Sequence, residues 1–224
     1  MLLVLAITEP PASYERPKKW AQNLKDVLSA TVVRDATTRL VFLNMVIWGS
    51  GALVMFWVNQ KYWQETAVPL PWFGVLLAGY NLIDGVAAKC AALGATRYGR
   101  RPLLAVVGVL PVVAYFGMVA FFGLAGILFG FVFKIGRGVL GVLFMEALNE
   151  RIPSAFRATV ISLSQLGLRG SFCLQGPLVG YGIDAWGLPS VLSALGILFS
   201  IASVCLLLPL AIRETAQTMK EASP

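Results

Sequence analysis

The chain has no histidine, three cysteines and few charged residues in its 224 positions. The lack of histidine removes the commonest metal ligand and the usual proton-transfer side chain near neutral pH. Charged residues make up 13% of the sequence, about half the share of a typical soluble domain, and 58% of the residues are hydrophobic. Cys90, Cys173 and Cys205 fall inside apolar stretches, so we expect buried thiols, with no disulfide and no metal site. This composition favours a membrane protein.

Sequence signatures of enzymes are also missing. The chain has no phosphate-binding Walker loop, no G-x-S-x-G motif and no HExxH zinc motif. Its buried acidic residues are not spaced as a catalytic pair. We therefore expect no enzymatic activity and no cofactor.

Six long apolar stretches fill the chain, at residues 39–61, 70–96, 101–122, 124–148, 156–181 and 188–212. Each is long enough for a helix to cross roughly 30 Å of hydrocarbon, and none alternates like a membrane β-strand. The predicted fold class is an all-α membrane protein with six transmembrane helices. The third and sixth stretches have no charge in their interiors, so we expect these two helices at the periphery, facing lipid. This three-plus-three pattern is typical of one half of a transporter.

Basic residues are distributed unevenly along the chain. Most of the 18 lysines and arginines fall in segments that would share one side of a membrane, and Lys61 alone falls in a segment on the other side. By the positive-inside rule, this predicts a multi-pass protein of the cell membrane with both termini in the cytoplasm. The net charge of +7 therefore reflects topology, and no nucleic-acid partner is expected. Tryptophans near the predicted outer ends support this topology: Trp57, Trp63, Trp72 and Trp186.

The flanking segments complete the predicted organisation. Residues 1–9 resemble the end of a preceding, truncated span, so the chain is expected to be the C-terminal half of a longer protein. Residues 10–38 are expected to form a cytoplasmic linker. Within it, 20–35 suits an amphipathic helix on the membrane surface, with an unstructured tether as the alternative. Residues 39–212 form the six-span unit, and 213–224 a polar, disordered cytoplasmic tail.

Charged side chains near the centres of the predicted spans are the candidate functional residues. They are Asp84 in the second span, Lys134 and Arg137 in the fourth, and Arg169 in the fifth. An ionisable group in lipid costs at least ~2.5–3.5 kcal/mol, so each must face protein or a water-filled cavity. We expect Asp84 to contact Lys134 or Arg137, with Arg169 as the next candidate.

Two interpretations of these charges stay open. They could line a substrate or proton pathway, with Asp84 as a proton-coupling carboxylate, or form a static buried ion pair that orders the bundle. Their excess of positive charge suits an anionic or polar substrate, or acidic groups on a partner. Asn44 and Trp48 in the first span are further candidate pathway residues, with simple packing as the alternative for Trp48.

Two short motifs resemble a known family. The loop Gly94–Pro102 (GATRYGRRP) resembles the D-R-x-G-R-R loop of the major facilitator superfamily, although Thr96 stands where that motif has aspartate. The segment from Glu146 through Pro153 to Arg157 resembles the acid–proline–arginine link between later spans of bacterial members. With the order of the spans, the chain resembles the C-terminal six-helix half of such a transporter.

The resemblance implies a function and a set of roles. It implies secondary active transport of a small solute by alternating access, such as proton-coupled efflux, at a site near the membrane midplane. It also implies that Glu146 pairs with loop arginines in a cytoplasmic gate, drawn from Arg97, Arg100, Arg101 and Arg157. An N-terminal six-span half or a partner chain would complete the cavity, so the chain alone is expected not to transport. The alternative is a non-transporting membrane module, or an inactive remnant, that partners another membrane chain.

Overall fold

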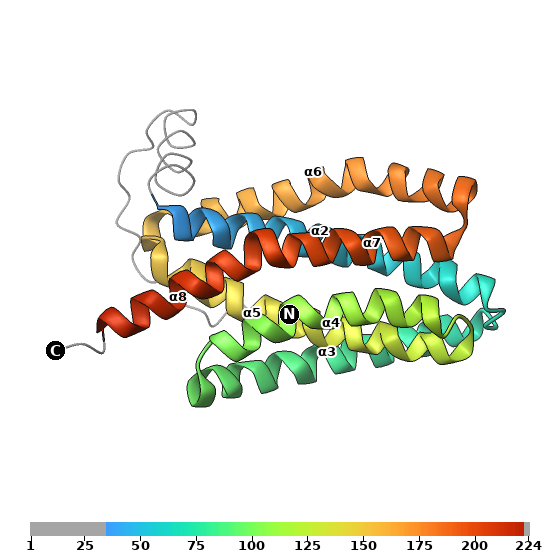
Figure 1. Ribbon diagram of the computed structural model, residues 1–224, viewed down its shortest axis with the longest axis horizontal. Coiled ribbons are helices and arrows are strands. Elements are labelled where there is room, and N and C mark those ends of the chain that lie inside the picture. The colour runs from blue at the N-terminus through green and yellow to red at the C-terminus, as the bar shows by residue number, and fades with distance from the viewer. Residues whose placement is uncertain (1–34, 222–224) are drawn as a thin grey trace, which may run out of the picture.

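The computed structural model describes residues 35–221, without the side chains of 155 and 215–221. Helices make up nearly all of this range, which contains no strand, and successive long helices run in opposite directions (Figure 1). The helices are α2 (Ala36–Glu65), α3 (Pro71–Tyr98), α4 (Arg101–Ala120), η3 (Leu124–Gly126), α5 (Ile127–Arg151), α6 (Ser154–Trp186), α7 (Leu188–Ala202), η4 (Ser203–Leu207) and α8 (Leu208–Glu221). The predicted end of a preceding span and the amphipathic linker helix lie outside the described residues.

The sequence sets the helix ends through capping groups, prolines and glycines. Asp35 caps α2 by accepting hydrogen bonds from the amides of Thr37 and Thr38 at 3.1 and 2.9 Å. Proline occupies the first turn of α3, α4 and α7, where its missing N–H costs no helical hydrogen bond. Gly187, with φ of 80°, makes the tight reversal between α6 and α7 in a conformation that favours glycine.

The long helices form two groups that lie side by side. α2 lies with α6 and α7, and α3 lies with α4 and α5 (Figure 1). The groups are joined where α2 packs on α5 and where α4 packs on α7. Aromatic side chains fill these joints: the stacked rings of Tyr115 and Phe199 lie 5.4 Å apart between α4 and α7. As a result, α3 and α6 stand at opposite edges of the bundle and do not pack on each other.

Five of the described helical segments are long and apolar enough to cross a membrane, as expected of a multi-pass membrane protein. They are α2, α3, α4, the stretch Leu124–Arg151 that joins η3 to α5, and the stretch Leu188–Glu214 in α7, η4 and α8. The predicted fifth span corresponds to α6. This helix has 33 residues, but it is not among the five, because serines, glutamines and Arg169 dilute its apolar character.

Two helices extend beyond the ends predicted from the sequence. The first helix runs from Ala36 to Glu65, beyond both ends of the predicted stretch 39–61. The tail predicted to be disordered from 213 continues α8 as a helix to Glu221.

The expectation of buried thiols was wrong, because Cys90, Cys173 and Cys205 are all exposed on the bundle surface. A thiol is small and weakly polar, so it is tolerated on a face that contacts lipid.

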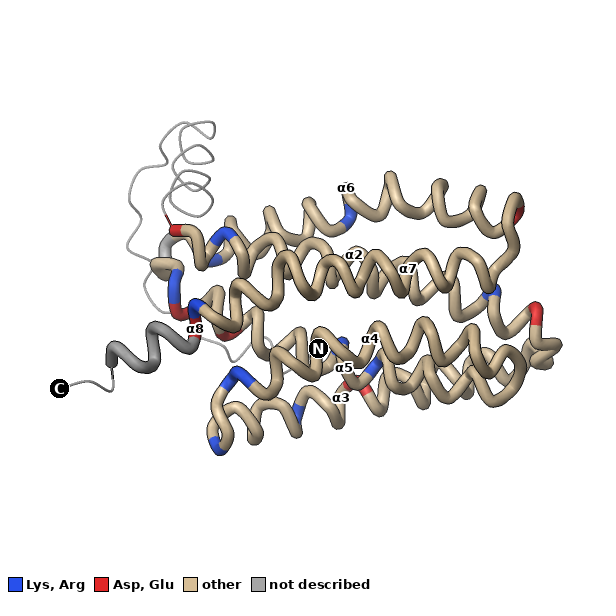
Figure 2. Tube along the Cα trace, viewed as in Figure 1, with Lys and Arg blue, Asp and Glu red and all other residues tan. Residues whose placement is uncertain are grey.

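Charges lie mainly at one end of the bundle (Figure 2). That end holds the start of α2, the α3–α4 and α5–α6 connections and the start of α8. The opposite end carries few charged residues, among them Lys61, which pairs with Glu65 at 3.5 Å. The one-sided distribution of basic residues expected from the sequence is therefore present in three dimensions.

Candidate functional site: a charged cavity between four helices

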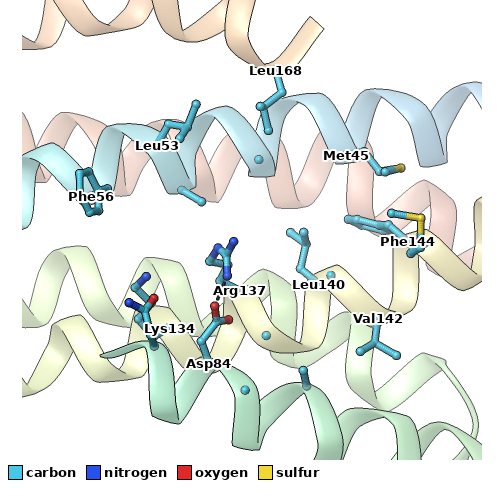
Figure 3. Close-up of a pocket in the computed structure, with 18 of the residues that line it drawn as sticks. Met45, Leu53, Phe56, Asp84, Lys134, Arg137, Leu140, Val142, Phe144 and Leu168 are labelled. Carbon is cyan, nitrogen blue, oxygen red and sulfur yellow. Dashed lines mark hydrogen bonds and ion pairs between the residues drawn. The ribbon is translucent and has the colours of Figure 1, made fainter. Parts of the chain in front are cut away.

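A cavity of about 780 Å³ opens between α2, α3, α5 and α6. Figure 3 shows α3 and α5 on one side of it, with Leu53 and Phe56 of α2 and Leu168 of α6 facing them across the space. The lining residues come from these four helices, while α4 and α7 pack together elsewhere in the bundle. The two charge-free helices therefore lie away from the polar site, but they were expected at the periphery and instead pack on each other where the two groups join. The helices at the edges of the bundle are α3 and α6 (Figure 1).

Asp84 and Arg137 meet at the wall of this cavity. Arg137 Nη1 donates to Asp84 Oδ2 in an ion pair that joins α3 to α5 (Figure 3). The predicted contact of Asp84 with one of the cations of the fourth span is therefore confirmed. The Asp84 side chain is 13% exposed, and the Arg137 side chain is 48% exposed and reaches into the cavity.

Gly138 explains how the two helices approach closely enough for this pair. A β-carbon at this position would lie 3.0 Å from the Ala87 β-carbon and 3.0 Å from the Ala88 backbone nitrogen. It would also come still closer to the backbone carbonyl oxygen of Asp84, nearer than β-carbons approach other atoms, so glycine is required for this close packing of α5 on α3. Gly138 thus lets α3 and α5 come close together, and Asp84 and Arg137 can pair because they lie at the same depth along the two helices.

Lys134 and Arg169 line the same cavity but are not paired in this way. Lys134 lies one helical turn from Arg137, next to the ion pair (Figure 3). Arg169 is a lining residue from α6. Within residues 35–221, neither cation has a carboxylate oxygen within 4.0 Å. Asp84 is the one acidic residue among the described lining residues, which also include three cations. Its Oδ1 is buried without a described hydrogen-bond partner. The structure brings together the four charged residues that the sequence singled out.

Asn44 and Trp48 are not among the residues that line the cavity, and for Trp48 the alternative of simple packing describes its position. Both are buried on the side of α2 that faces α7 and η4. The Asn44 amide donates to the carbonyl of Leu206 at 3.2 Å, and Trp48 Nε1 donates to Asn44 Oδ1 at 3.0 Å. Leu206 lies in the π-helical turn η4, where the regular hydrogen-bond ladder is interrupted. Asn44 thus satisfies a backbone group inside the core, which a hydropathy pattern cannot reveal.

A second cluster of charges lies at the basic end of the bundle. Arg100, just before α4, donates through Nη1 to Glu150 Oε2 of α5 at 2.6 Å. Glu146 is 3.9 Å from the Arg100 guanidinium, which is an ion pair without a hydrogen bond. The hydrogen-bonded partner of Arg100 is therefore Glu150, one turn beyond the Glu146 that the resemblance implies, because Glu150 lies closer to the level of the α3–α4 connection. The hydrogen bond from Arg100 to Glu150 raises the pKa of the arginine above its usual value.

The other arginines assigned to this gate have different roles. The Arg97 guanidinium lies over the ring of Tyr98, 5.5 Å from its centroid. Arg157 donates to the Asn149 carbonyl at 2.8 Å, which fastens the α5–α6 connection. Arg101 forms no ion pair within the described part of the chain. Of the four arginines, Arg100 is thus the one that the structure pairs with Glu146.

One pair at this end does not follow from the sequence interpretation. Arg151 at the end of α5 is 2.5 Å from Glu214 of α8, and each side chain is 15% exposed. The sequence interpretation places Glu214 in a disordered tail, where it would have no fixed partner. The contrary signal is Leu210, an apolar residue one turn earlier, which is buried in the core. A helix that continues past Leu210 places Glu214 on the same face.

The outer faces of α3 and α6 are left uncovered. Large apolar side chains stand exposed along both helices, among them Leu82 at 68% and Leu166 at 67%. A β-carbon added at Gly85 or Gly141 on the cavity side, or at Gly170 on α6, would have no described atom within 4 Å. Exposed apolar surface of this extent is covered by lipid or by another protein.

No family model, curated protein or solved structure matches this chain. The resemblance to the major facilitator superfamily therefore stays a prediction from the two motifs and the order of the spans.

Proposed function

We propose that this chain is a six-helix unit of a secondary transporter of the major facilitator type, in which α6 also spans the membrane, as the fifth of the six helices. In this proposal both termini face the cytoplasm, and a second six-helix unit closes the open side of the cavity. A small solute binds between the two units, and one unit rocks against the other to alternate access.

The cavity with its Asp84–Arg137 pair is the observation that carries this proposal. Ionisable groups inside a membrane are costly, so they are placed where they bind, pair or conduct. Here four of them gather around one cavity of about 780 Å³, a volume within the range of roughly 300–1,000 Å³ typical of small-molecule sites. A purely structural ion pair would not need the additional cations Lys134 and Arg169.

The arrangement also supports movement of one unit against another. The cavity-lining helices α3 and α6 are held to the bundle on one side only, since α3 packs mainly on α5 and α6 mainly on α2. Gly85 of α3, Gly141 of α5 and Gly170 of α6 have no close neighbours and leave room for another helix to approach and slide. The pairs of Arg100 with Glu150 and of Arg151 with Glu214 fasten the unit at its basic end, so it can move as one body.

A non-transporting membrane module is the second candidate. The uncovered apolar faces of α3 and α6 favour it as much as they favour a transporter, because a permanent partner would bury them equally well. The two candidates differ in whether the cavity contains water. A transporter needs a hydrated cavity, whereas a permanent partner would fill it with side chains.

Cysteine labelling distinguishes these candidates. The native Cys90, Cys173 and Cys205 are first replaced by serine, and single cysteines are placed at Leu53 or Leu168 in the cavity. Matched controls place the cysteine at Val109 of α4 or Ile197 of α7, which are 56% and 54% exposed on the apolar surface outside the cavity. Vesicles are prepared from source cells that carry the substituted gene at its own locus, so that any partner chain is present.

We expect a hydrophilic, membrane-impermeant methanethiosulfonate to label the cavity cysteines and to leave Val109→Cys and Ile197→Cys unlabelled. Cavity labelling from both faces of the vesicles, in right-side-out and inverted preparations, supports alternating access. If Leu53→Cys and Leu168→Cys stay as unreactive as the lipid-facing controls, the cavity is filled and the module is the better description.

A further inference from the structure

We propose that the cavity binds an amphipathic organic anion, a molecule with a carboxylate or phosphate head and an apolar body. This inference rests on the proposed function, because it takes the cavity as the solute site. It adds the chemical class of the solute and the two residues that select it, Lys134 and Arg169.

The charges of the cavity give the first part of the argument. Asp84 and Arg137 neutralise each other in their ion pair. Lys134 and Arg169 are left as cations without a described carboxylate within 4.0 Å. Uncompensated charge at membrane depth is unfavourable, and an anion that binds between these side chains compensates it. The site therefore favours an anion over a neutral or cationic solute.

The rest of the lining gives the second part. Apart from these charges and two amides, the cavity is surrounded by apolar side chains, including Met45, Leu53, Phe56, Phe144 and Leu168. Figure 3 shows Leu53, Phe56 and Leu168 on the wall opposite the ion pair. An inorganic anion would leave this wall without a partner, whereas an apolar body attached to the anionic head would cover it.

A second copy of the chain does not satisfy the same charges. A symmetric pair of copies would bring another Lys134 and another Arg169 to the interface, which would double the unpaired positive charge. Two sources can supply the anion itself, namely a water-soluble organic acid or an anionic phospholipid that enters from the open side. Both have the same head-and-body chemistry.

Protection of Leu168→Cys from labelling tests the inference in the same vesicles. Three probes share one apolar body and differ in charge: 2-naphthoate, neutral 2-naphthamide, and the 2-naphthylmethyl trimethylammonium cation. We expect 2-naphthoate to slow labelling and the other two to need at least about tenfold higher concentrations for equal protection, since a charge-assisted contact is worth about that factor. Fusing the vesicles with phosphatidylcholine liposomes, with or without phosphatidylglycerol, tests the lipid source.

Substitution of the cations assigns the effect to them. Arg169→Gln and Lys134→Gln should each raise the concentration of 2-naphthoate needed for half-protection by about tenfold, with protection in each variant measured against its own labelling rate without probe. Arg213→Gln removes an exposed arginine of α8 that lies outside the cavity, and it should leave protection unchanged.

The outcomes separate this inference from the proposed function. Protection by 2-naphthoate, or by phosphatidylglycerol alone, supports an anion site and identifies its source. Labelling that no anion slows, or that naphthamide and the ammonium probe slow equally, overturns the anion site and leaves the hydrated cavity intact. A complete lack of labelling at Leu168→Cys would instead overturn the proposed function, and the anion site with it.

Discussion

Replacing Gly138 by alanine should loosen the packing of α5 on α3. The added β-carbon would lie 3.0 Å from both the Ala87 β-carbon and the Ala88 backbone nitrogen. Neither is the flexible end of a side chain, so the helices themselves must separate. The contact lies beside Asp84, so the same movement would strain the ion pair with Arg137.

The size of the effect follows from two opposing contributions. Overpacking of a tight contact costs about 1–3 kcal/mol, while exchanging glycine for alanine in a helix contributes up to about 1 kcal/mol in the opposite direction. Gly141 provides the matched control, because it lies one turn further along the same helix and has no atom within 4 Å of the added β-carbon. Gly141→Ala gains the helical contribution without the steric cost. We therefore expect Gly138→Ala to be less stable than Gly141→Ala by roughly 2 kcal/mol, or about 4–8 °C in Tm for a chain of this length.

The measurement is thermal unfolding of the full chain in mild detergent, followed by the loss of the monodisperse gel-filtration peak after heating. Both variants and the unmodified chain are compared in the same detergent and at the same concentration. Equal stability of the two alanine variants would show that α3 and α5 do not approach as closely as described. The account of how the Asp84–Arg137 pair is built would then be wrong.

Two further predictions concern the charged end of the bundle. Arg100→Glu should lower Tm, and adding Glu150→Arg should restore more of the loss than adding Glu146→Arg does, because Glu150 is the hydrogen-bonded partner; equal rescue by both would contradict this geometry. The pKa of the Asp35 carboxyl is lowered, because hydrogen bonds from the start of α2 outweigh the opposing effect of burial. The capping stabilisation, about 1 kcal/mol, should therefore be complete above the unfolded pKa of about 3.9 and be lost as pH falls through the lower folded value. Asp35→Ala should lower Tm at pH 7 and lose this acid-dependent step, and an unchanged pH profile would show that the cap is not ionised.

The sequence by itself determined the class of the protein and the depth of its charges. Composition and run length predict membrane-spanning helices because an apolar chain must form all its backbone hydrogen bonds internally when water is absent. The same runs fix depth, since each helical residue adds about 1.5 Å along the axis. Depth alone therefore matches Asp84 with the cations of the fourth span. The apolar character of α6 is weaker than that of the other long helices, so its assignment as a membrane span stays a proposal.

Tertiary structure alone decided how each helix is rotated about its axis and which helices it packs against. Asn44 has the depth of a cavity residue, but the rotation of α2 directs it to the Leu206 carbonyl in η4. Similarly, Glu146 and Glu150 differ by a single turn, and the position of Arg100 selects the second. Rotation and pairing depend on close contacts such as the one at Gly138, where two helices far apart in sequence touch. A pattern along one segment carries depth and polarity, but it contains no information about the shape of the surface against which that segment packs.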